Sequence, residues 1–283
     1  MIKLGLLGNN ISKSEMPNFM TKLGNEFDFE IKYELFDKAL EKKFNFKNFL
    51  SQIKEKNIFG LNVTYPFKEL AVEHSTELSE ETKLVKSTNL LLINESITSH
   101  NTDYIGFLNT YKFNFNQRPS KLVVLGGGGV GKSVCFALIK LGVKELYIIE
   151  KDHIKLEKLI KDLKKQYEQV YSIMLDDLIE NQREFDGFLN CSEQGHVKTP
   201  GNSFDGLRLN NNQWCFDVVY TPAMTTFLKN SEKSGAKIIT GIELFLFQGI
   251  ESFIIFTEQE KLRKKIMNNY DKIREYFFKK LII

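Results

Sequence analysis

Residues 122–141, LVVLGGGGVGKSVCFALIKL, contain a glycine-rich turn between two apolar runs. The first run is typical of a buried strand and the second of a helix. Gly126, Gly128 and Gly131 occupy the glycine positions of G-x-G-x-x-G, where missing Cβ atoms let the chain turn tightly and approach a pyrophosphate at a helix N-terminus. A glycine-rich turn without a ligand is the alternative, and the strand-turn-helix context favours a dinucleotide.

The alternation of strand-like and helix-like runs continues on both sides of this turn. Strand-like runs at 146–149, 187–190 and 215–219 predict a doubly wound parallel sheet. Residues 1–100 alternate the runs IKLGLLG, YELFD and IFGLNVTY with charged, helix-like stretches, as in an α/β unit with a mostly parallel sheet. The length of 283 residues also favours more than one domain. We therefore predict two α/β domains.

The next strand-like run, LYII, ends at Glu150, which is 24 positions after Gly126. An acidic residue near this spacing holds the ribose hydroxyls of a dinucleotide, and its charge repels a 2′-phosphate. Glu150 therefore favours NAD. Lys151 and Lys155 follow and are able to bind such a phosphate, so NADP stays open. An exposed Glu-Lys pair is also ordinary surface chemistry.

The composition excludes several classes of protein. Lys and Arg total 39 against 36 for Asp and Glu, so the net charge of +3 predicts no nucleic-acid surface. The Lys-rich tail at 258–280 is interpreted as the solvated face of amphipathic helices. The three cysteines lie far apart and the four histidines have no zinc-ligand spacing, so we expect neither a disulfide framework nor a metal.

Two apolar segments bear on location. The N-terminal MIKLGLLGNN is too short an apolar run for a signal peptide. The segment 242–256 is interrupted by Glu243, Gln248 and Glu251, which are costly in a bilayer, so we expect a buried helix and no membrane span. We expect a cytoplasmic protein.

Two charged residues are candidates for proton chemistry. Hydride reduction of a ketone leaves an alkoxide, which needs a cation or acid within hydrogen-bond reach. A lysine paired with an aspartate can supply both. Lys68 in GLNVTYPFK and Asp103 in NTDYIGF stand at the ends of strand-like runs and are two candidates for these roles. Taken singly, each is an ordinary surface residue, because lysine and aspartate are rarely buried without a partner.

These motifs together resemble the shikimate dehydrogenase family. NVTYPFK at 62–68 and NTDYIGF at 101–107 resemble its substrate-domain signatures, NVTxPFK and NTDxxGF. Further similar segments are GNNISKSEMP at 8–17 (substrate-carboxylate loop), VLGGGGVGKS at 124–133 (cofactor loop), NCSEQG at 190–195 (NATPxG turn), DVVYTP at 217–222 with Thr225 (D-x-x-Y-x-P-x-x-T), and GIEL at 241–244 with Gln248 (GxxM(x₃)Q helix).

The resemblance implies an NAD(P)-dependent oxidoreductase that interconverts 3-dehydroshikimate and shikimate in aromatic amino acid (chorismate) biosynthesis. It implies a substrate-binding α/β domain at 1–103, a dinucleotide-binding Rossmann domain at 104–240 facing it across a cleft, and C-terminal helices at 241–283 that return to the first domain. A monomer or homodimer is expected.

The resemblance also assigns residues, with Lys68 and Asp103 as the catalytic pair. The substrate contacts would be Ser14, the position of Met16, Asn62, Thr64, Asn89, Asp103, Tyr220 and Gln248. The cofactor contacts would be Gly126, Gly128, Gly129, Gly131, Glu150, Lys151, Asn190, Val218 and Gly241.

The sequence departs from the family pattern at several positions. Met16 stands where the family has a second hydroxyl residue, although pairing Ser12 with Ser14 would restore two hydroxyls by shifting the loop. Leu90 replaces Thr, Glu193 replaces Pro, and Glu150-Lys151-Asp152 replaces the phosphate-binding NRT element. These changes leave open an NAD-dependent quinate/shikimate dehydrogenase. A non-catalytic nucleotide-binding regulator is a further alternative, against which the retained Lys68 and Asp103 argue.

Overall fold

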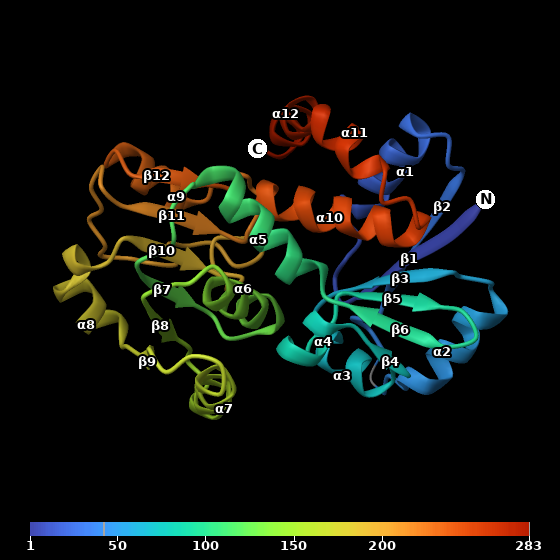
Figure 1. The fold of residues 1–283 in the computed structure, drawn as a ribbon, viewed down its shortest axis with the longest axis horizontal. Coiled ribbons are helices and arrows are strands. Elements are labelled where there is room, and N and C mark those ends of the chain that lie inside the picture. Colours follow the sequence, from blue (N-terminus) through green and yellow to red (C-terminus); the bar gives the residue numbers. More distant parts are fainter. Residues whose placement is uncertain (42, 283) are drawn as a thin grey trace. The chain divides into compact units, whose positions relative to one another are not determined.

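The computed structural model describes residues 1–41 and 43–282. Contacts divide the chain into two compact units (Figure 1). The first comprises Met1–Ile105 and Gln248–Ile266, and the second comprises Gly106–Phe247 and Met267–Ile283. Both units are therefore discontinuous in sequence. Their boundaries fall inside helices α5 (Thr102–Asn114), α10 (Gly241–Thr257) and α11 (Leu262–Asn268).

Over the described part of the first unit, six strands form one sheet in the order β2-β1-β3-β5-β6-β4. Its strands are β1 (Ile2–Gly8), β2 (Ile31–Asp37), β3 (Gly60–Val63), β4 (Glu77–Leu78), β5 (Leu90–Ile93) and β6 (Ile97–His100). β5 pairs antiparallel with both β3 and β6, whereas the β1–β2, β1–β3 and β4–β6 pairs are parallel. The predicted mostly parallel sheet is confirmed.

The helices of the first unit are α1 (Met16–Glu26), α2 (Phe46–Glu55), α3 (Lys68–Glu73) and α4 (Glu80–Val85). The two longer helices, α1 and α2, each bury an apolar stripe. In α2, the Asn45 side chain accepts a hydrogen bond from the Asn48 N–H and so caps the helix start. Phe46, Phe49 and Ile53 follow at helical spacing and join a core that contains sheet residues such as Leu61.

The second unit is built on a parallel sheet. Over its described residues the strand order is β12-β11-β10-β7-β8-β9, and every pair is parallel. Its strands are β7 (Lys121–Leu125), β8 (Glu145–Ile149), β9 (Val170–Ser172), β10 (Gly187–Asn190), β11 (Trp214–Asp217) and β12 (Lys237–Ile239). Counted from β7, this is the 3-2-1-4-5-6 order of a Rossmann sheet, which confirms the predicted doubly wound architecture.

The helices of the second unit alternate with these strands along the chain. They are α6 (Gly129–Lys140), α7 (His153–Lys164), α8 (Leu175–Glu180), the 3₁₀ turn η1 (Gln182–Glu184) and α9 (Thr226–Lys233), followed by α12 (Tyr270–Leu281) near the C-terminus. The division by contacts places α12 in the second unit, whereas the sequence led us to expect C-terminal helices at 241–283 that pack back on the first domain. The predicted domain limits stay a prediction.

Helix α10 contains the apolar segment 242–256, and its side chains are almost all buried. Two acidic residues interrupt it, and each is paired with an arginine. Glu243 binds Arg274 of α12, with 2.9 Å from Nε and 2.5 Å from an Nη, and Glu251 binds Arg263 of α11 through both carboxylate oxygens. Among the residues that the structure describes, no helix is long and apolar enough to cross a membrane.

Candidate active site

The candidate catalytic residues Lys68 and Asp103 form an ion pair in the first unit. Lys68 Nζ lies 2.5 Å from Asp103 Oδ2, and the side chains are 12% and 9% exposed. At this depth an isolated charge would be costly, and the contact between the two side chains offsets that cost. The structure therefore brings together an ammonium and a carboxylate that are 35 positions apart in sequence.

Local interactions fix where both residues sit. Lys68 is the first residue of α3, and its carbonyl oxygen accepts a hydrogen bond from the Thr88 N–H at 3.0 Å. Asp103 is the second residue of α5. The preceding Asn101 is fully buried, and its Oδ1 accepts from the Tyr104 N–H at 2.9 Å as a helix cap does. The NTD motif thus combines a helix cap with the candidate catalytic carboxylate.

Asn89 joins Asp103 to the start of α5. The Thr102 N–H donates to Asn89 Oδ1 at 2.7 Å. Because a backbone N–H only donates, this bond fixes which side of the carboxamide is oxygen. Asn89 Nδ2 therefore faces Asp103 Oδ1 at 3.0 Å and the Thr102 hydroxyl at 2.8 Å, with Gln248 Oε1 at 3.4 Å. The second Asp103 oxygen is thereby satisfied.

The predicted substrate contact Asn62 belongs to the same connected group of side chains. It is 3% exposed, donates from Nδ2 to Ser252 Oγ at 3.1 Å, and accepts from the Tyr33 hydroxyl at 2.9 Å. Ser252 in turn lies 3.2 Å from the Thr102 hydroxyl. A continuous set of hydrogen bonds therefore runs from Tyr33 to Lys68.

Among the residues that join this group, Tyr33, Thr102 and Ser252 were not singled out from the sequence. Thr102 lies inside the NTD motif, and Ser252 lies one helical turn after Gln248, so both were accessible by position. Tyr33 has no such signal. Its approach to Asn62 depends on β1 separating β2 from β3, which is a matter of strand order.

The loop expected to bind a substrate carboxylate follows β1. Ser14 is half-buried, and its Oγ accepts from the Met16 N–H at 3.3 Å. Met16 is the first residue of α1 and is 7% exposed. Thr64 is half-buried after β3, and a Cβ on Gly8 would overlap its methyl group. These positions lie in the first unit together with Lys68.

Asp37 holds the beginning of this loop. Its two carboxylate oxygens accept from the backbone N–H groups of Asn10 and Ile11, each at 2.9 Å, and Asn10 has a left-handed φ of 57°. Ser14 then continues the turn, because its N–H donates to the Ile11 carbonyl at 2.9 Å.

The glycine loop of the second unit has the geometry that its motif predicts. Gly126 has a φ of 101°, which favours glycine. A Cβ on Gly131 would overlap the Gly126 carbonyl oxygen and lie 2.9 Å from its carbon. By contrast, apart from Gly128 and its two chain neighbours, no atom of the described chain lies within 4 Å of a Cβ built at Gly128, which precedes the first residue of α6, Gly129. This arrangement leaves a helix N-terminus open to an anion.

Glu150 is half-buried directly after β8 and contacts the glycine loop. Its Oε2 accepts from the Gly127 N–H at 2.7 Å, and its Oε1 accepts from the Asp152 N–H at 3.1 Å. Of the two lysines that bear on NADP, Lys155 lies 3.6 Å from Asp152, while Lys151 is exposed. The Glu150 carboxylate is therefore in direct hydrogen-bond contact with the loop.

A buried polar cluster holds the turn after β10. Asn190 is fully buried, donates from Nδ2 to the Gln194 carbonyl and to Asp217 Oδ1, and accepts from Ser192. Asp217 also accepts from the Thr225 hydroxyl at 2.7 Å. Burial raises the pKa of Asp217 to about 7, while hydrogen bonds from Thr225, the Val219 N–H and Asn190 act to lower it. The predicted cofactor contact of Asn190 stays a prediction.

The remaining predicted residues lie nearby in the second unit. Val218 donates its N–H to the Asn190 carbonyl at 2.8 Å. A Cβ on Gly241 would lie 2.5 Å from the Val218 carbonyl oxygen, so glycine allows the close approach of α10. Tyr220 stacks on Phe245 with ring centroids 5.0 Å apart. Of the predicted substrate contacts, Tyr220 is thus the one assigned to the second unit.

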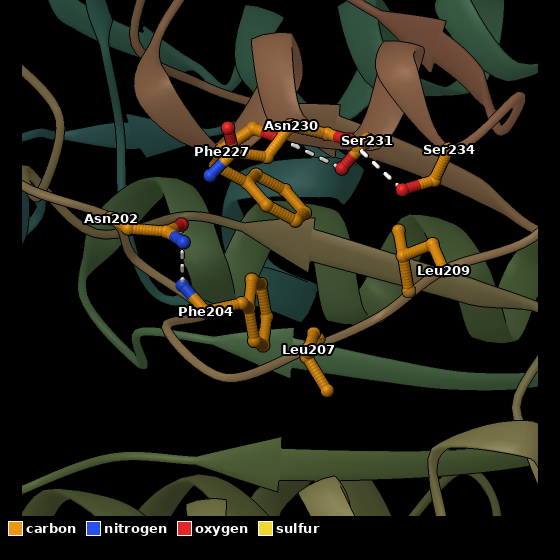
Figure 2. A pocket seen from close by; sticks show the side chains of 8 residues that line it. All are labelled: Asn202, Phe204, Leu207, Leu209, Phe227, Asn230, Ser231 and Ser234. Carbon is orange, nitrogen blue, oxygen red and sulfur yellow. Dashed lines mark hydrogen bonds between the residues drawn. The ribbon is translucent and has the colours of Figure 1, made fainter.

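A small pocket elsewhere in the second unit is unsuited to a dinucleotide. Figure 2 shows its lining, in which the rings of Phe204 and Phe227 lie beside each other, tilted by 47° with centroids 4.9 Å apart. Its volume is about 10 Å³, close to the minimum for one water. Among residues 1–41 and 43–282, no group of three or more His, Cys, Asp or Glu side chains is arranged to hold a metal ion.

The chain is similar to known proteins over most of its length. The family described as "Shikimate dehydrogenase substrate binding domain" matches residues 6–91. A shikimate dehydrogenase (NADP(+)) from Prochlorococcus marinus is 32% identical over 238 residues, which cover 80% of this chain and 82% of the relative.

Two solved structures share the fold. A quinate dehydrogenase from Corynebacterium glutamicum in complex with NAD is 26% identical, with a TM-score of 0.83 over 94% of this chain and 99% of the other. A shikimate 5-dehydrogenase from Thermus thermophilus in complex with NADP(H) and shikimate is 26% identical, with a TM-score of 0.78 over 91% and 94%. With the motifs quoted above, these similarities establish that the chain belongs to the shikimate dehydrogenase family.

Proposed function

We propose that this chain is an NAD(P)-dependent dehydrogenase that interconverts shikimate and 3-dehydroshikimate. The observation that carries the proposal is the buried Lys68–Asp103 ion pair, which Asn89 holds from the other side of the carboxylate. A protein that only bound a nucleotide would have no use for this pair. Ser14, Asn62, Thr64, Asn89, Tyr220 and Gln248 are proposed as substrate contacts.

In this proposal the proton chemistry belongs to Lys68. When bound, the nicotinamide cofactor supplies or accepts the hydride. During reduction, Lys68 places its ammonium at the carbonyl oxygen, stabilises the negative charge that develops there and donates a proton from Nζ. During oxidation it receives the hydroxyl proton. Asp103 keeps the ammonium in position and accepts a second hydrogen bond from Asn89, so its orientation does not depend on the substrate.

The glycine loop fits a dinucleotide. The open space at Gly128 and the start of α6 would receive the pyrophosphate, with Gly126 and Gly131 allowing the turn. Glu150 would accept hydrogen bonds from the ribose hydroxyls. Because its charge repels a 2′-phosphate, and because Lys155 is already close to Asp152, we propose a preference for NAD over NADP.

A second candidate function is the oxidation of quinate. It is favoured by the TM-score of 0.83 with the quinate dehydrogenase that binds NAD, together with Glu150 in this chain. Absorbance of the reduced nicotinamide, followed with shikimate and quinate against NAD and NADP, distinguishes the four combinations. Activity with shikimate and NAD is expected. No turnover of either substrate would refute both functions.

The proposal also covers the location of the enzyme, its oligomeric state and its partners. We propose that it acts in the cytoplasm as a monomer or homodimer, without a nucleic-acid partner. Light scattering after size-exclusion chromatography measures the assembly, and a mass above that of two 32.9 kDa chains would contradict it.

A further inference from the structure

Tyr33 approaches the proposed substrate site from a strand that contributes no other member to it. The residue is half-buried on β2, and its hydroxyl donates to Asn62 Oδ1 at 2.9 Å. Asn62 lies on β3, and β1 separates the two strands in the sheet. The tyrosine is thus one side chain removed from a residue proposed to touch substrate.

The hydrogen bonds determine which atom of the Asn62 carboxamide is the nitrogen Nδ2 and which is the oxygen Oδ1. Ser252 Oγ donates to the carbonyl oxygen of Gln248 at 2.8 Å, and a carbonyl oxygen only accepts. The one proton of the Ser252 hydroxyl is therefore committed, so Ser252 accepts from Asn62 at 3.1 Å. Nδ2 must face Ser252, and Oδ1 must face Tyr33.

We propose that Tyr33 is a positioning residue for substrate recognition that acts through Asn62. A carboxamide has two N–H hydrogens and an oxygen that accepts two bonds. Ser252 takes one hydrogen and Tyr33 takes one acceptor position, which leaves one donor and one acceptor of fixed direction for a substrate hydroxyl. Without the Tyr33 hydroxyl, Asn62 is held at one end alone and its carboxamide tilts.

The inference rests on the proposed function, because it assumes that Asn62 contacts the substrate. Tyr33→Phe removes one oxygen and keeps the ring, so it tests the hydroxyl with little change in packing. KM for shikimate is expected to rise about three- to tenfold, the effect of losing one neutral hydrogen bond. Since this contact is made equally in ground and transition states, kcat is expected to stay within about twofold.

Tyr147→Phe is the matched control. Tyr147 also donates one 2.9 Å hydrogen bond, to Glu145, but it lies in the second unit. Its removal is expected to leave KM for shikimate unchanged. If Tyr33→Phe instead altered KM for shikimate, KM for the cofactor and the thermal midpoint together, a general structural role would replace the positioning role.

A double-mutant cycle tests the route through Asn62. If Tyr33 acts through Asn62, Tyr33→Phe has no further effect on KM in an Asn62→Ser background. An additive effect of the two substitutions on KM would overturn the proposal. A KM for shikimate of Tyr33→Phe equal to that of the wild type would also overturn it, and this measurement needs no Asn62→Ser protein, so it remains informative if that variant does not fold. Wild-type protein inactive on shikimate and quinate would refute the proposed function, whereas an active wild type with unaffected Tyr33→Phe would refute this inference alone.

Discussion

Alanine substitutions of Gly131 and Gly128, two glycines of the loop between β7 and α6, are expected to have different effects: the first on stability and the second on cofactor binding. Gly131 is packed against backbone, because an added Cβ would overlap the Gly126 carbonyl oxygen and lie 2.9 Å from its carbon. The fit is at least half an ångström tighter than ordinary carbon contacts of about 3.5 Å. Gly128 has a φ of −71°, which alanine adopts readily, and the space around its Cβ position is open.

The magnitudes follow from these surroundings. For Gly131→Ala, overpacking costs about 1–3 kcal/mol and the helix preference of alanine returns about 0.5–1 kcal/mol, so a net loss of stability is expected. For Gly128→Ala, the loss is confined to the weaker capping by alanine, roughly 0.5 kcal/mol. The methyl group would instead occupy space proposed for the pyrophosphate, so KM for NAD should rise about tenfold or more while KM for shikimate stays the same.

Thermal unfolding and steady-state kinetics of both variants provide the assay. Gly131→Ala should have the lower unfolding midpoint, and Gly128→Ala should combine a near-normal midpoint with weak cofactor binding in titration calorimetry. A Gly128→Ala enzyme with unchanged affinity for NAD would show that the dinucleotide does not approach this loop. Equal stability of Gly131→Ala and wild type would contradict the packing.

Three further substitutions test the proposed mechanism. Lys68→Ala should lower kcat on the order of 10³-fold without unfolding the protein. Lys83→Ala, which removes an exposed lysine, is the control, and a near-normal kcat of Lys68→Ala would refute the role of Lys68. Met16→Ser should lower KM for shikimate about ten- to hundredfold with kcat unchanged. It should also lower the unfolding midpoint, because Met16 is buried. An unchanged KM would show that position 16 does not face the substrate carboxylate. Glu150→Gln should raise kcat/KM with NADP relative to NAD, and wild-type preference for NADP would contradict the argument from charge.

The sequence was most informative where structure is local. The strand-turn-helix around Gly126 predicted β7 and α6, and strand-like runs predicted β8, β10 and β11, because runs of consecutive apolar residues are typical of strands in a parallel sheet. The strands β4, β5, β6, β9 and β12 were not identified individually. β4, β9 and β12 are only two or three residues long and carry little periodicity, whereas β5 and β6 have four residues, the same length as the identified β10 and β11.

In the candidate site, too, the residues within contiguous motifs were predicted and those that depend on distant contacts were missed. Lys68 and Asp103 were located by their motifs, each of which is contiguous in sequence. Tyr33 was missed because its contact with Asn62 requires β2, β1 and β3 to lie side by side in the sheet. The sequence around Tyr33 and the sequence around Asn62 do not specify this strand order. The arginine partners of Glu243 and Glu251 were missed for a similar reason, since they lie 31 and 12 positions away, respectively, on other helices.

The discontinuity of the first unit has a consequence for synthesis on the ribosome. Its sheet is complete once residue 105 has been made, but Gln248–Ile266, which includes the Ser252 and Phe256 packed on Asn62 and Gly60, follows about 140 residues later. At about 5–20 residues per second, the nascent unit waits roughly 7–30 s with this apolar surface uncovered. We expect chains stalled at residue 240 to be cleaved by protease within 1–105, and chains stalled after the last residue has emerged to resist; equal resistance would show that the first segment folds without its closing helix.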